Sequence, residues 1–129
     1  MDKTQALYSF WSGFDWPAID EQSSYDEGTL EDLNIDFPYI TFEVLTSDFG
    51  SEVSMTASLY DESTSWERIT AKAEEISAAI GRGGKILRIS NGAVWIKRGS
   101  PFAQRMADDT KDNIRRIILT ITAEFLTAE

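Results

Sequence analysis

Carboxylates are the side chains of this sequence that could perform acid and base chemistry. Two adjacent pairs could be proposed as the catalytic groups of a hydrolase: Asp61 with Glu62, and Glu74 with Glu75. Such a pair is defined by the distance between its carboxylates across a cleft, which spacing along the chain does not give. Histidine and cysteine are absent, which excludes Ser-His-Asp triads, HExxH zinc sites and thiolate chemistry. We therefore predict no enzyme, with no catalytic residue, no metal site and no cofactor. A small carboxylate-dependent hydrolase is kept as an alternative.

A glycine-rich run at residues 81–85, Gly-Arg-Gly-Gly-Lys, has the composition of a phosphate-binding loop. A phosphate loop follows a strand and opens a helix, so that the amides of the helix N-terminus meet the anion. Here a predicted helix precedes the run and a predicted strand follows it. The run therefore predicts a helix end and a tight turn. Residues 26–28, Asp-Glu-Gly, likewise lack the alternating ligands and the final Glu of a calcium loop.

Residues 63–98 contain the elements around which the rest of the chain is arranged. They predict one helix followed by a two-stranded hairpin. Thr64 and Glu67 have the spacing of a capping box, and apolar residues then recur every three or four positions up to Ile80. From residue 85 to residue 90 apolar and polar residues alternate. Asn91 and Gly92 suit a type I′ turn, and residues 93–97 return as the second strand.

The rest of the chain predicts one more helix, one more hairpin and a final strand. Residues 2–14 predict a helix capped by Asp2, with an aromatic edge in the core. Residues 39–46 and 52–60 alternate as paired strands joined by a turn at 48–51, and residues 114–126 form the last strand. Residues 99–106 alternate too little for a strand, and Pro101 suits the first turn of a brief helix. The predicted fold is α+β, with helices packed on one face of a mostly antiparallel five-stranded sheet, in the order α-β-β-α-β-β-β.

Length and composition suit a single domain. The chain has 129 residues, of which 42% are hydrophobic, and residues 1–129 are enough to enclose one core. Residues 16–38 are acidic and predict an extended loop. No apolar run approaches the roughly 20 residues that cross a bilayer, and the first residues lack a signal-peptide pattern. We therefore expect a cytoplasmic protein with no membrane partner.

Charge is divided unevenly between the two halves of the chain. Residues 1–67 contain one basic residue and 15 acidic ones, whereas residues 68–129 contain 11 basic and 7 acidic ones. The halves could lie face to face in one domain, or the acidic half could be a solvated surface. On opposite flanks they would favour head-to-tail contacts between copies, the geometry that closes rings. The pI near 4.4 opposes phosphate binding, so no specific nucleic acid partner is predicted.

Cations and large side chains are combined between residues 95 and 106. Aromatic residues, Met and Arg are the types enriched in protein interfaces. From this run we predict a protein interface formed by Lys97, Arg98, Phe102, Arg105 and Met106. The alternative is that Trp95 and Phe102 belong to the core while the cations are solvated.

Several segments, taken together and in chain order, resemble small tail proteins of phages and prophages of Gram-positive bacteria. They are residues 8–14 (YSFWSGF), 16–18 (WPA), 37–44 (FPYITFEV), 63–66 (STSW), 80–85 (IGRGGK) and 95–104 (WIKRGSPFAQ). The chain is most similar to the tail terminator, or tail-completion, proteins of long-tailed phages. Charged positions that would line a DNA channel, which members of that family are expected to carry, are not assigned in this sequence.

That resemblance implies an α+β subunit that forms a hexameric ring on the head-proximal end of the tail tube. The ring stops tube growth and joins tail to head. The implied partners are copies of the chain itself, the tail-tube protein and the head connector protein. The implied location is the bacterial host cytoplasm during assembly and the virion tail afterwards. The alternative is a head-tail connector or stopper, or another minor virion protein.

Overall fold

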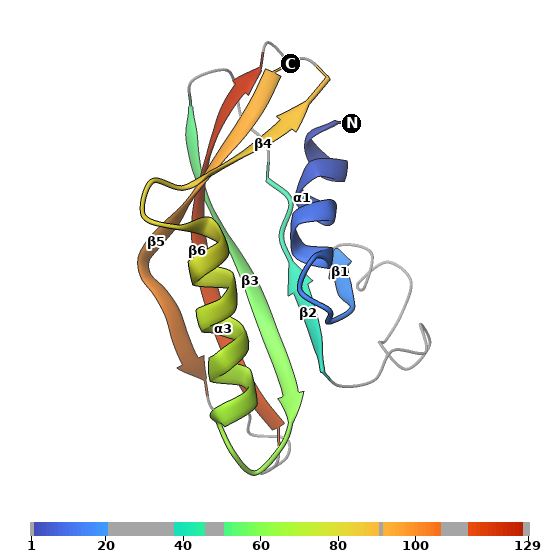
Figure 1. Cartoon of the computed structure of the whole chain (residues 1–129), viewed down its shortest axis with the longest axis vertical. Coiled ribbons are helices and arrows are strands. Elements are labelled where there is room, and N and C mark those ends of the chain that lie inside the picture. The colour runs from blue at the N-terminus through green and yellow to red at the C-terminus, as the bar shows by residue number, and fades with distance from the viewer. Residues whose placement is uncertain (1, 21–37, 46–50, 91, 107–113, 128–129) are drawn as a thin grey trace.

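The computed structural model describes residues 2–20, 38–45, 51–90, 92–106 and 114–127. These residues form two helices and one six-stranded sheet (Figure 1). The helices are α1 (Lys3–Ser12) and α3 (Glu67–Ile80). The strands are β1 (Ala18–Asp20), β2 (Tyr39–Phe42), β3 (Glu52–Glu62), β4 (Lys85–Ile89), β5 (Gly92–Met106) and β6 (Ile114–Thr127).

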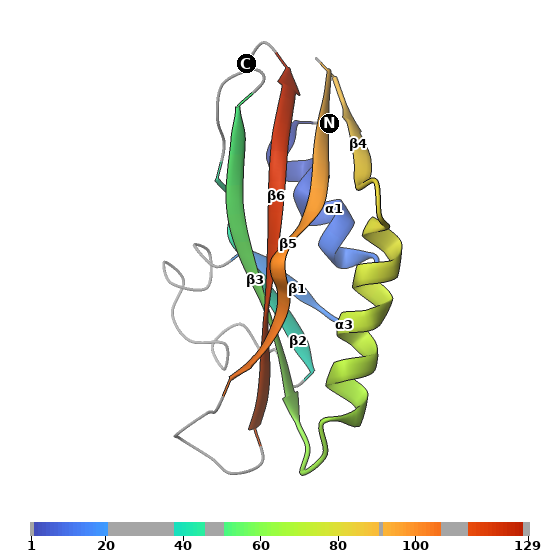
Figure 2. The ribbon, with the colours of Figure 1, turned by 90° about the vertical axis from the view of Figure 1, so that its left-hand side faces the viewer.

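The sheet has the strand order β1-β2-β3-β6-β5-β4. Strands β1 and β2 are parallel and all other neighbours are antiparallel. Both helices lie against the same face (Figure 2). The predicted α+β class and largely antiparallel sheet are confirmed, but the sheet has six strands rather than five. The additional strand, β1, lies in the stretch predicted as an acidic loop, because three residues are too few to show alternation.

Helix α1 begins with the cap that the sequence predicts. The backbone N–H of Gln5 donates to Asp2 Oδ1 at 2.8 Å, and the backbone N–H of Asp2 donates to Gln5 Oε1 at 2.9 Å. The two hydrogen bonds form a capping box. The helix is shorter than predicted and ends at Ser12. The predicted aromatic edge is confirmed, since its side chains are buried: Leu7, Phe10, Trp11 and Phe14.

Helix α3 begins later than predicted, and the predicted capping box at Thr64 is wrong. Trp66 occupies the N-cap position and no side chain caps the helix. Instead, Ser63 Oγ accepts from the Ser65 amide and Ser65 Oγ accepts from the Glu67 amide, both at 3.1 Å. These local serine contacts compete with the cap that the spacing suggested. The predicted apolar stripe is confirmed by the buried residues Ile69, Ala73, Ile76 and Ile80.

The predicted hairpin of β4 and β5 is confirmed. The backbone conformation at Gly84, just before β4, requires a glycine. Gly84 has a φ of +84°, and a Cβ there would lie 2.5 Å from both the Ile96 carbonyl oxygen and Trp95 Nε1. Gly81, with a φ of +76°, ends α3. The order helix, turn, strand confirms that residues 81–85 do not form a phosphate loop.

The loop and brief helix predicted for residues 99–106 are wrong. Strand β5 continues to Met106, with a shift of register between Arg98 and Ala103. Beyond the shift, residues 103–106 pair with residues 119–116 of β6. Gly99 and Pro101 lie within the shift, where a missing ladder hydrogen bond is tolerated. The strand is therefore maintained by pairing with β6, which local residue patterns do not reveal.

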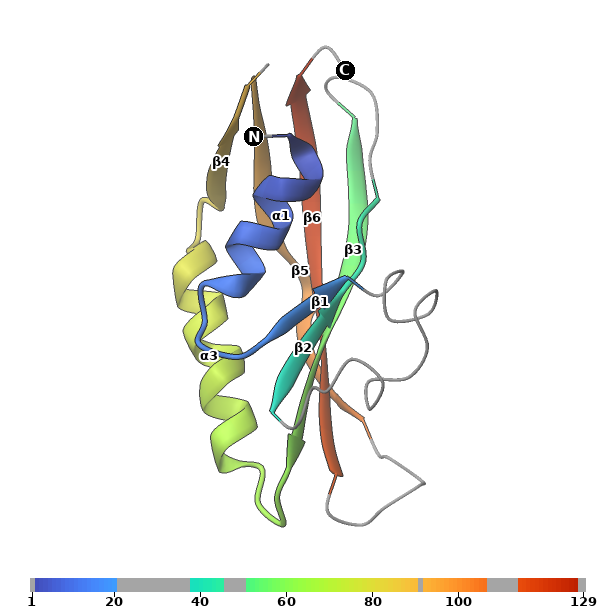
Figure 3. The ribbon, with the colours of Figure 1, turned by 90° about the vertical axis from the view of Figure 1, so that its right-hand side faces the viewer.

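The core fills the space between the two helices and the sheet (Figure 3). Strand β6 lies at the centre of the sheet, between β3 and β5. Its predicted inward residues are buried: Ile117, Leu119, Ile121, Ala123 and Phe125. On β3, the predicted inward residues Met55, Ala57 and Leu59 are also buried. Alternation along these strands thus predicted the covered face of the sheet.

Several predicted features lie outside the described residues. They are residues 21–37 of the acidic loop, including the Asp-Glu-Gly run, residues 48–50 of the first hairpin turn, Asn91 of the second, and residues 107–113. Within the ranges that are described, no helix combines the length and the apolar character needed to cross a membrane.

Candidate protein interface

The division of charge along the sequence becomes a division across the sheet. Strands β1, β2 and β3 form one side and carry four acidic residues and no basic one. Strands β6, β5 and β4 form the other side and carry seven basic residues and one acidic one. We call these the acidic flank and the basic flank. Two of the four acids are engaged inside the subunit: Asp61 is buried against Arg68, and Glu52 pairs with Lys97 of the basic flank.

Strand β5 carries all five residues predicted as an interface, but its geometry separates them. Arg98 and Arg105 pair in register with buried residues of β6, on the face that the helices cover. Lys97 and Met106 are each one position away from these arginines and therefore point to the opposite face. Phe102 lies in the register shift and lines a hollow beside α3. The structure thus brings Arg98, Phe102 and Arg105 together and places Lys97 and Met106 elsewhere.

The two arginines on the helix-covered face contact α3. Arg98 Nη1 donates to Ser77 Oγ at 2.9 Å, and Arg105 Nη2 donates to Thr70 Oγ1 at 3.4 Å. The Arg105 guanidinium also lies 5.0 Å from the centre of the Trp66 ring. Between these contacts lies a hollow of about 260 Å³ whose lining includes part of α3 and β5. Both side chains therefore bridge β5 to α3 within one subunit.

Lys97 is also engaged within the subunit, on the other face of the sheet. Its Nζ lies 3.1 Å from Glu52 Oε2 and 4.3 Å from the centre of the Trp95 ring. Trp95 donates from Nε1 to the Gly83 carbonyl oxygen at 2.8 Å. Trp95 and Phe102 are both half-buried, and Phe102 packs against the core. All three predicted cations of β5 thus have contacts inside the subunit.

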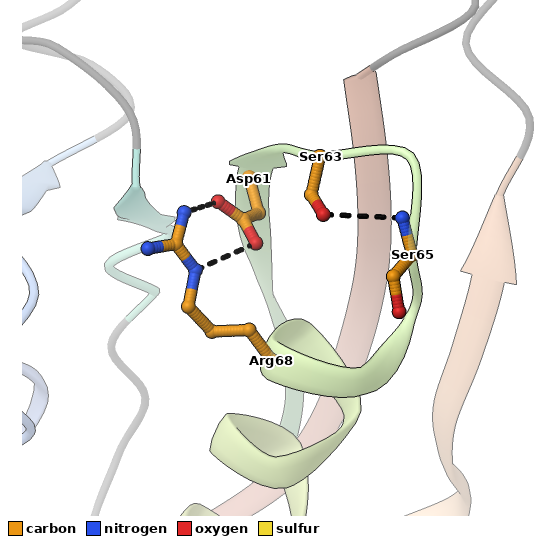
Figure 4. Close-up of polar contacts among 4 residues, drawn as sticks. All are labelled: Asp61, Ser63, Ser65 and Arg68. Carbon is orange, nitrogen blue, oxygen red and sulfur yellow. Dashed lines mark hydrogen bonds and ion pairs between the residues drawn. The ribbon is translucent and has the colours of Figure 1, made fainter.

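A buried carboxylate is paired with an arginine at the start of α3 (Figure 4). Asp61 is 0% exposed and accepts two hydrogen bonds from the Arg68 guanidinium, of which the one from Nε is 2.9 Å long. The hydrogen bond to Asp61, helped by the negative charge of the carboxylate, raises the pKa of Arg68 above its ordinary value despite the opposing effect of burial. Asp61 therefore holds α3 against β3.

The two carboxylate pairs considered as hydrolytic groups do not converge on a shared cleft. Asp61 is held by Arg68, and Glu62, the next residue of the strand, points to the opposite face. Glu75 pairs with Lys72 at 3.0 Å, and Glu74 lines the hollow beside β5 without a second carboxylate. In the described ranges, no group of three or more His, Cys, Asp or Glu residues could hold a metal ion.

The edge strand β4 and the turn before it present a second set of cations, for which the sequence predicted no role in an interface. Arg82, Lys85 and Arg88 are exposed. Considering only residues that the structure describes, none of these three side chains makes a hydrogen bond, an ion pair or a ring contact. Ile86 lies among them and is 44% exposed. The available signal was a three-residue spacing of cations with no acidic residue between positions 76 and 107.

Helix α1 is flanked by two hollows. The first, of about 440 Å³, lies between α1 and β4, and its lining includes Phe10, Leu87, Lys85 and Arg88. The second, of about 640 Å³, lies on the acidic flank and is lined by Thr4, Gln5, Tyr8, Ser9, Asp20 and Phe42. Figure 3 shows α1 between β4 on one side and β1 with β2 on the other. Tyr8 is 52% exposed at the second hollow, which we call the Tyr8 hollow.

No protein-family model matches the chain, and a search of curated proteins found no similar sequence. The resemblance to phage tail terminators stays a prediction.

Proposed function

We propose that this chain is a non-enzymatic assembly subunit that associates head to tail with copies of itself. The observation that carries this proposal is the separation of the acidic flank from the basic flank across the sheet. A contact between unlike flanks leaves one flank of each terminal copy available, so association continues and gives a ring where the rotation between copies closes. The same contact brings opposite charges together and selects against wrong orientations.

The specific role that we propose is that of a phage or prophage tail terminator. In that role a ring of copies, as a hexamer, sits on the head-proximal end of the tail tube and joins tail to head. Two observations support it: the sequence segments that resemble this family, and an α+β subunit whose flanks suit a heterologous contact. The partners would be the tail-tube protein and the head connector protein, met in the host cytoplasm and retained in the virion tail.

The mass of the purified chain in solution tests this function. We expect oligomers that form at high concentration or on addition of tail-tube protein, and that weaken as salt is raised, because charged surfaces are screened. Sedimentation or light scattering at two salt concentrations, with and without tube protein, gives the measurement. A chain that stays monomeric under all of these conditions contradicts the proposal.

The same experiment separates the terminator from the alternative of a connector or stopper. A terminator binds the end of the tail tube, whereas a connector or stopper component binds the head connector protein in preference to the tube. Binding measured against each purified partner therefore distinguishes the two roles. Turnover of a hydrolysable substrate that is lost on substitution of Glu74 would instead support the carboxylate-dependent hydrolase.

A further inference from the structure

We infer that the outer edge of β4 binds an extended acidic segment of a partner protein, which pairs with β4 as one more strand of the sheet. This contact is separate from the proposed self-association and does not depend on it. In strand addition, backbone hydrogen bonds to the sheet edge provide affinity, and side chains that enter neighbouring pockets provide specificity. Strand β4 and the hollow beside it offer both.

The outer edge of β4 has backbone groups available for pairing. The strand is the last of the described sheet on its side, where its neighbour is β5. Within the described ranges, residues 85–89 make no backbone hydrogen bond beyond those of the sheet ladder. Alternate amides and carbonyls of a terminal strand point away from the sheet. The other terminal strand, β1, has three residues against five in β4, so β4 is the longer edge.

The hollow of about 440 Å³ between α1 and β4 lies directly against this edge. Four successive residues of β4, 85–88, contribute to its lining. Because successive side chains of a strand point to opposite faces, one hollow can contact all four only where it meets the strand's edge. The rest of the lining comes from α1, the residues after it and the end of α3, and includes Ala6, Phe10, Phe14 and Ala79. A side chain of an added strand that points toward the helices would enter this apolar space (Figure 3).

The cations of β4 favour an acidic segment. Lys85 shares the helix-covered face with the buried Leu87, and Arg88 lies on the opposite face. An added strand also has two faces, so it has one of these cations beside it on each face. Both cations are exposed, and neither makes a hydrogen bond, an ion pair or a ring contact with a described residue. Acidic residues opposite them would therefore gain cross-strand pairs without breaking existing ones.

The same cations disfavour pairing between two β4 edges. Two copies that met edge to edge would bring Lys85 and Arg88 of one copy beside the same residues of the other. Like charges at cross-strand positions destabilise a sheet, and charged side chains protect many sheet edges from such pairing. The edge therefore rejects a second β4 and accepts a strand of opposite charge.

A synthetic peptide gives the test. The acetylated and amidated sequence Thr-Glu-Leu-Val-Glu-Thr, antiparallel to β4, places one Glu opposite Arg88 and the other opposite Lys85. Its Leu then lies opposite Leu87, on the side of the hollow. The labelled peptide should bind the dilute chain in fluorescence anisotropy, and replacement of both Glu residues by Lys should weaken binding at least tenfold. Equal binding of the acidic and the basic peptide overturns the inference.

Two N-methylated peptides separate strand addition from simple attraction between charges. Methylation at alternate residues removes the amide donors from one edge of an extended peptide and leaves the other edge intact. One of the two alternate sets should weaken binding at least tenfold, and the other should stay within about threefold of the parent peptide, because only one edge faces β4. Equal binding by the two methylated peptides overturns strand addition.

Arg88→Glu and Arg82→Glu are matched variants of the chain. Arg88→Glu should weaken binding at least tenfold, and a peptide with Lys in place of its first Glu should restore it. Arg82→Glu makes the same charge change in the turn before β4, at a residue that does not line the hollow, and should change binding less than threefold. Thermal melting of both variants is the control for folding. Equal weakening by the two variants overturns the site.

The Arg88→Glu chain also tests whether a second copy occupies the edge. It keeps every acidic segment of the subunit but binds the peptide weakly. An excess of it should leave the peptide bound to the unchanged chain, and displacement of the peptide would assign the edge to a second copy and overturn the inference. These failures leave the proposed function intact, since that function is tested by the mass of the chain in solution. A chain that binds the peptide but never assembles contradicts the proposed function alone.

Discussion

Strands β4 and β5 are neighbours in one sheet and both are basic, but their cations have different surroundings. On β5, Lys97 pairs with Glu52, and Arg98 and Arg105 reach across to α3. On β4, Lys85 and Arg88 are exposed and make no such contact with any residue that the structure describes. A cation that already has a partner must give up that contact before it can bind another protein. The difference teaches that residue type alone does not show which cations already have a contact inside the subunit.

The largest expected effect concerns how β4 is joined to the sheet. Gly84→Ala should lower the free energy of unfolding by about 3 kcal/mol, because the position has a positive φ and its Cβ would overlap the Ile96 carbonyl oxygen. Gly83→Ala is the matched control, since nothing lies within 4 Å of a Cβ there. Denaturant titration of both variants gives the comparison. Equal free energies of unfolding for the two variants would show that position 84 does not require a glycine.

A smaller effect is expected at the ion pair that joins α3 to β3. Arg68→Ala should lower the free energy of unfolding by about 2 kcal/mol, because it leaves the buried Asp61 carboxylate without its partner. The Arg68 side chain is 57% exposed, so water reaches the pair and keeps the loss below that of a fully buried one.

Arg82→Ala is the matched control for Arg68→Ala on the β4 side. Arg82 is exposed and makes no hydrogen bond, ion pair or ring contact with a described residue, so its removal should change the free energy of unfolding by less than about 0.5 kcal/mol. Chemical denaturation with the same protocol measures both. A loss of stability in the Arg82 variant would remove the distinction between engaged and unengaged cations.

The smallest expected effect compares one arginine from each strand. Arg105→Ala should lower the free energy of unfolding by about 0.5–1 kcal/mol, because it removes the contacts with Trp66 and Thr70. Arg88→Ala should leave stability unchanged and weaken binding of the acidic peptide instead. Thermal melting together with fluorescence anisotropy gives both readouts. The comparison fails if Arg105→Ala weakens peptide binding in a subunit whose melting temperature is unchanged.

Much of the fold could be predicted from the sequence where the residue pattern is local. The Asp2 cap, the apolar stripe of α3 and the inward residues of β3 and β6 follow from spacing and are confirmed. Strand β1 could not be predicted, because its three residues are too few to show alternation. The second part of β5 could not be predicted, because the register shift between Arg98 and Ala103 interrupts the alternation along the strand. The cap at Thr64 failed because nearby serines offered the backbone competing hydrogen bonds.

The interface predicted on β5 stays a prediction, and the structure adds how its residues are distributed. The run that contains Trp95, Phe102 and three cations has the composition of an interface, but alternation along β5 sends its members to two faces. The cations of β4 attracted no prediction, because a sequence does not show which charges will find a partner in the folded chain. Asp61 was likewise considered as a catalytic group, although in the structure it is buried against Arg68.

By itself, the sequence determined the class of the fold, the covered face of the long strands, the absence of histidine and cysteine chemistry, and the unequal charge of the two halves. These are properties of residue type and short spacing, which local physics controls. Only the tertiary structure decided that the two charges lie on opposite flanks, and which cations remain without a contact in the described subunit. The order of strands in the sheet decides both, because it is set by pairings between residues far apart in the chain.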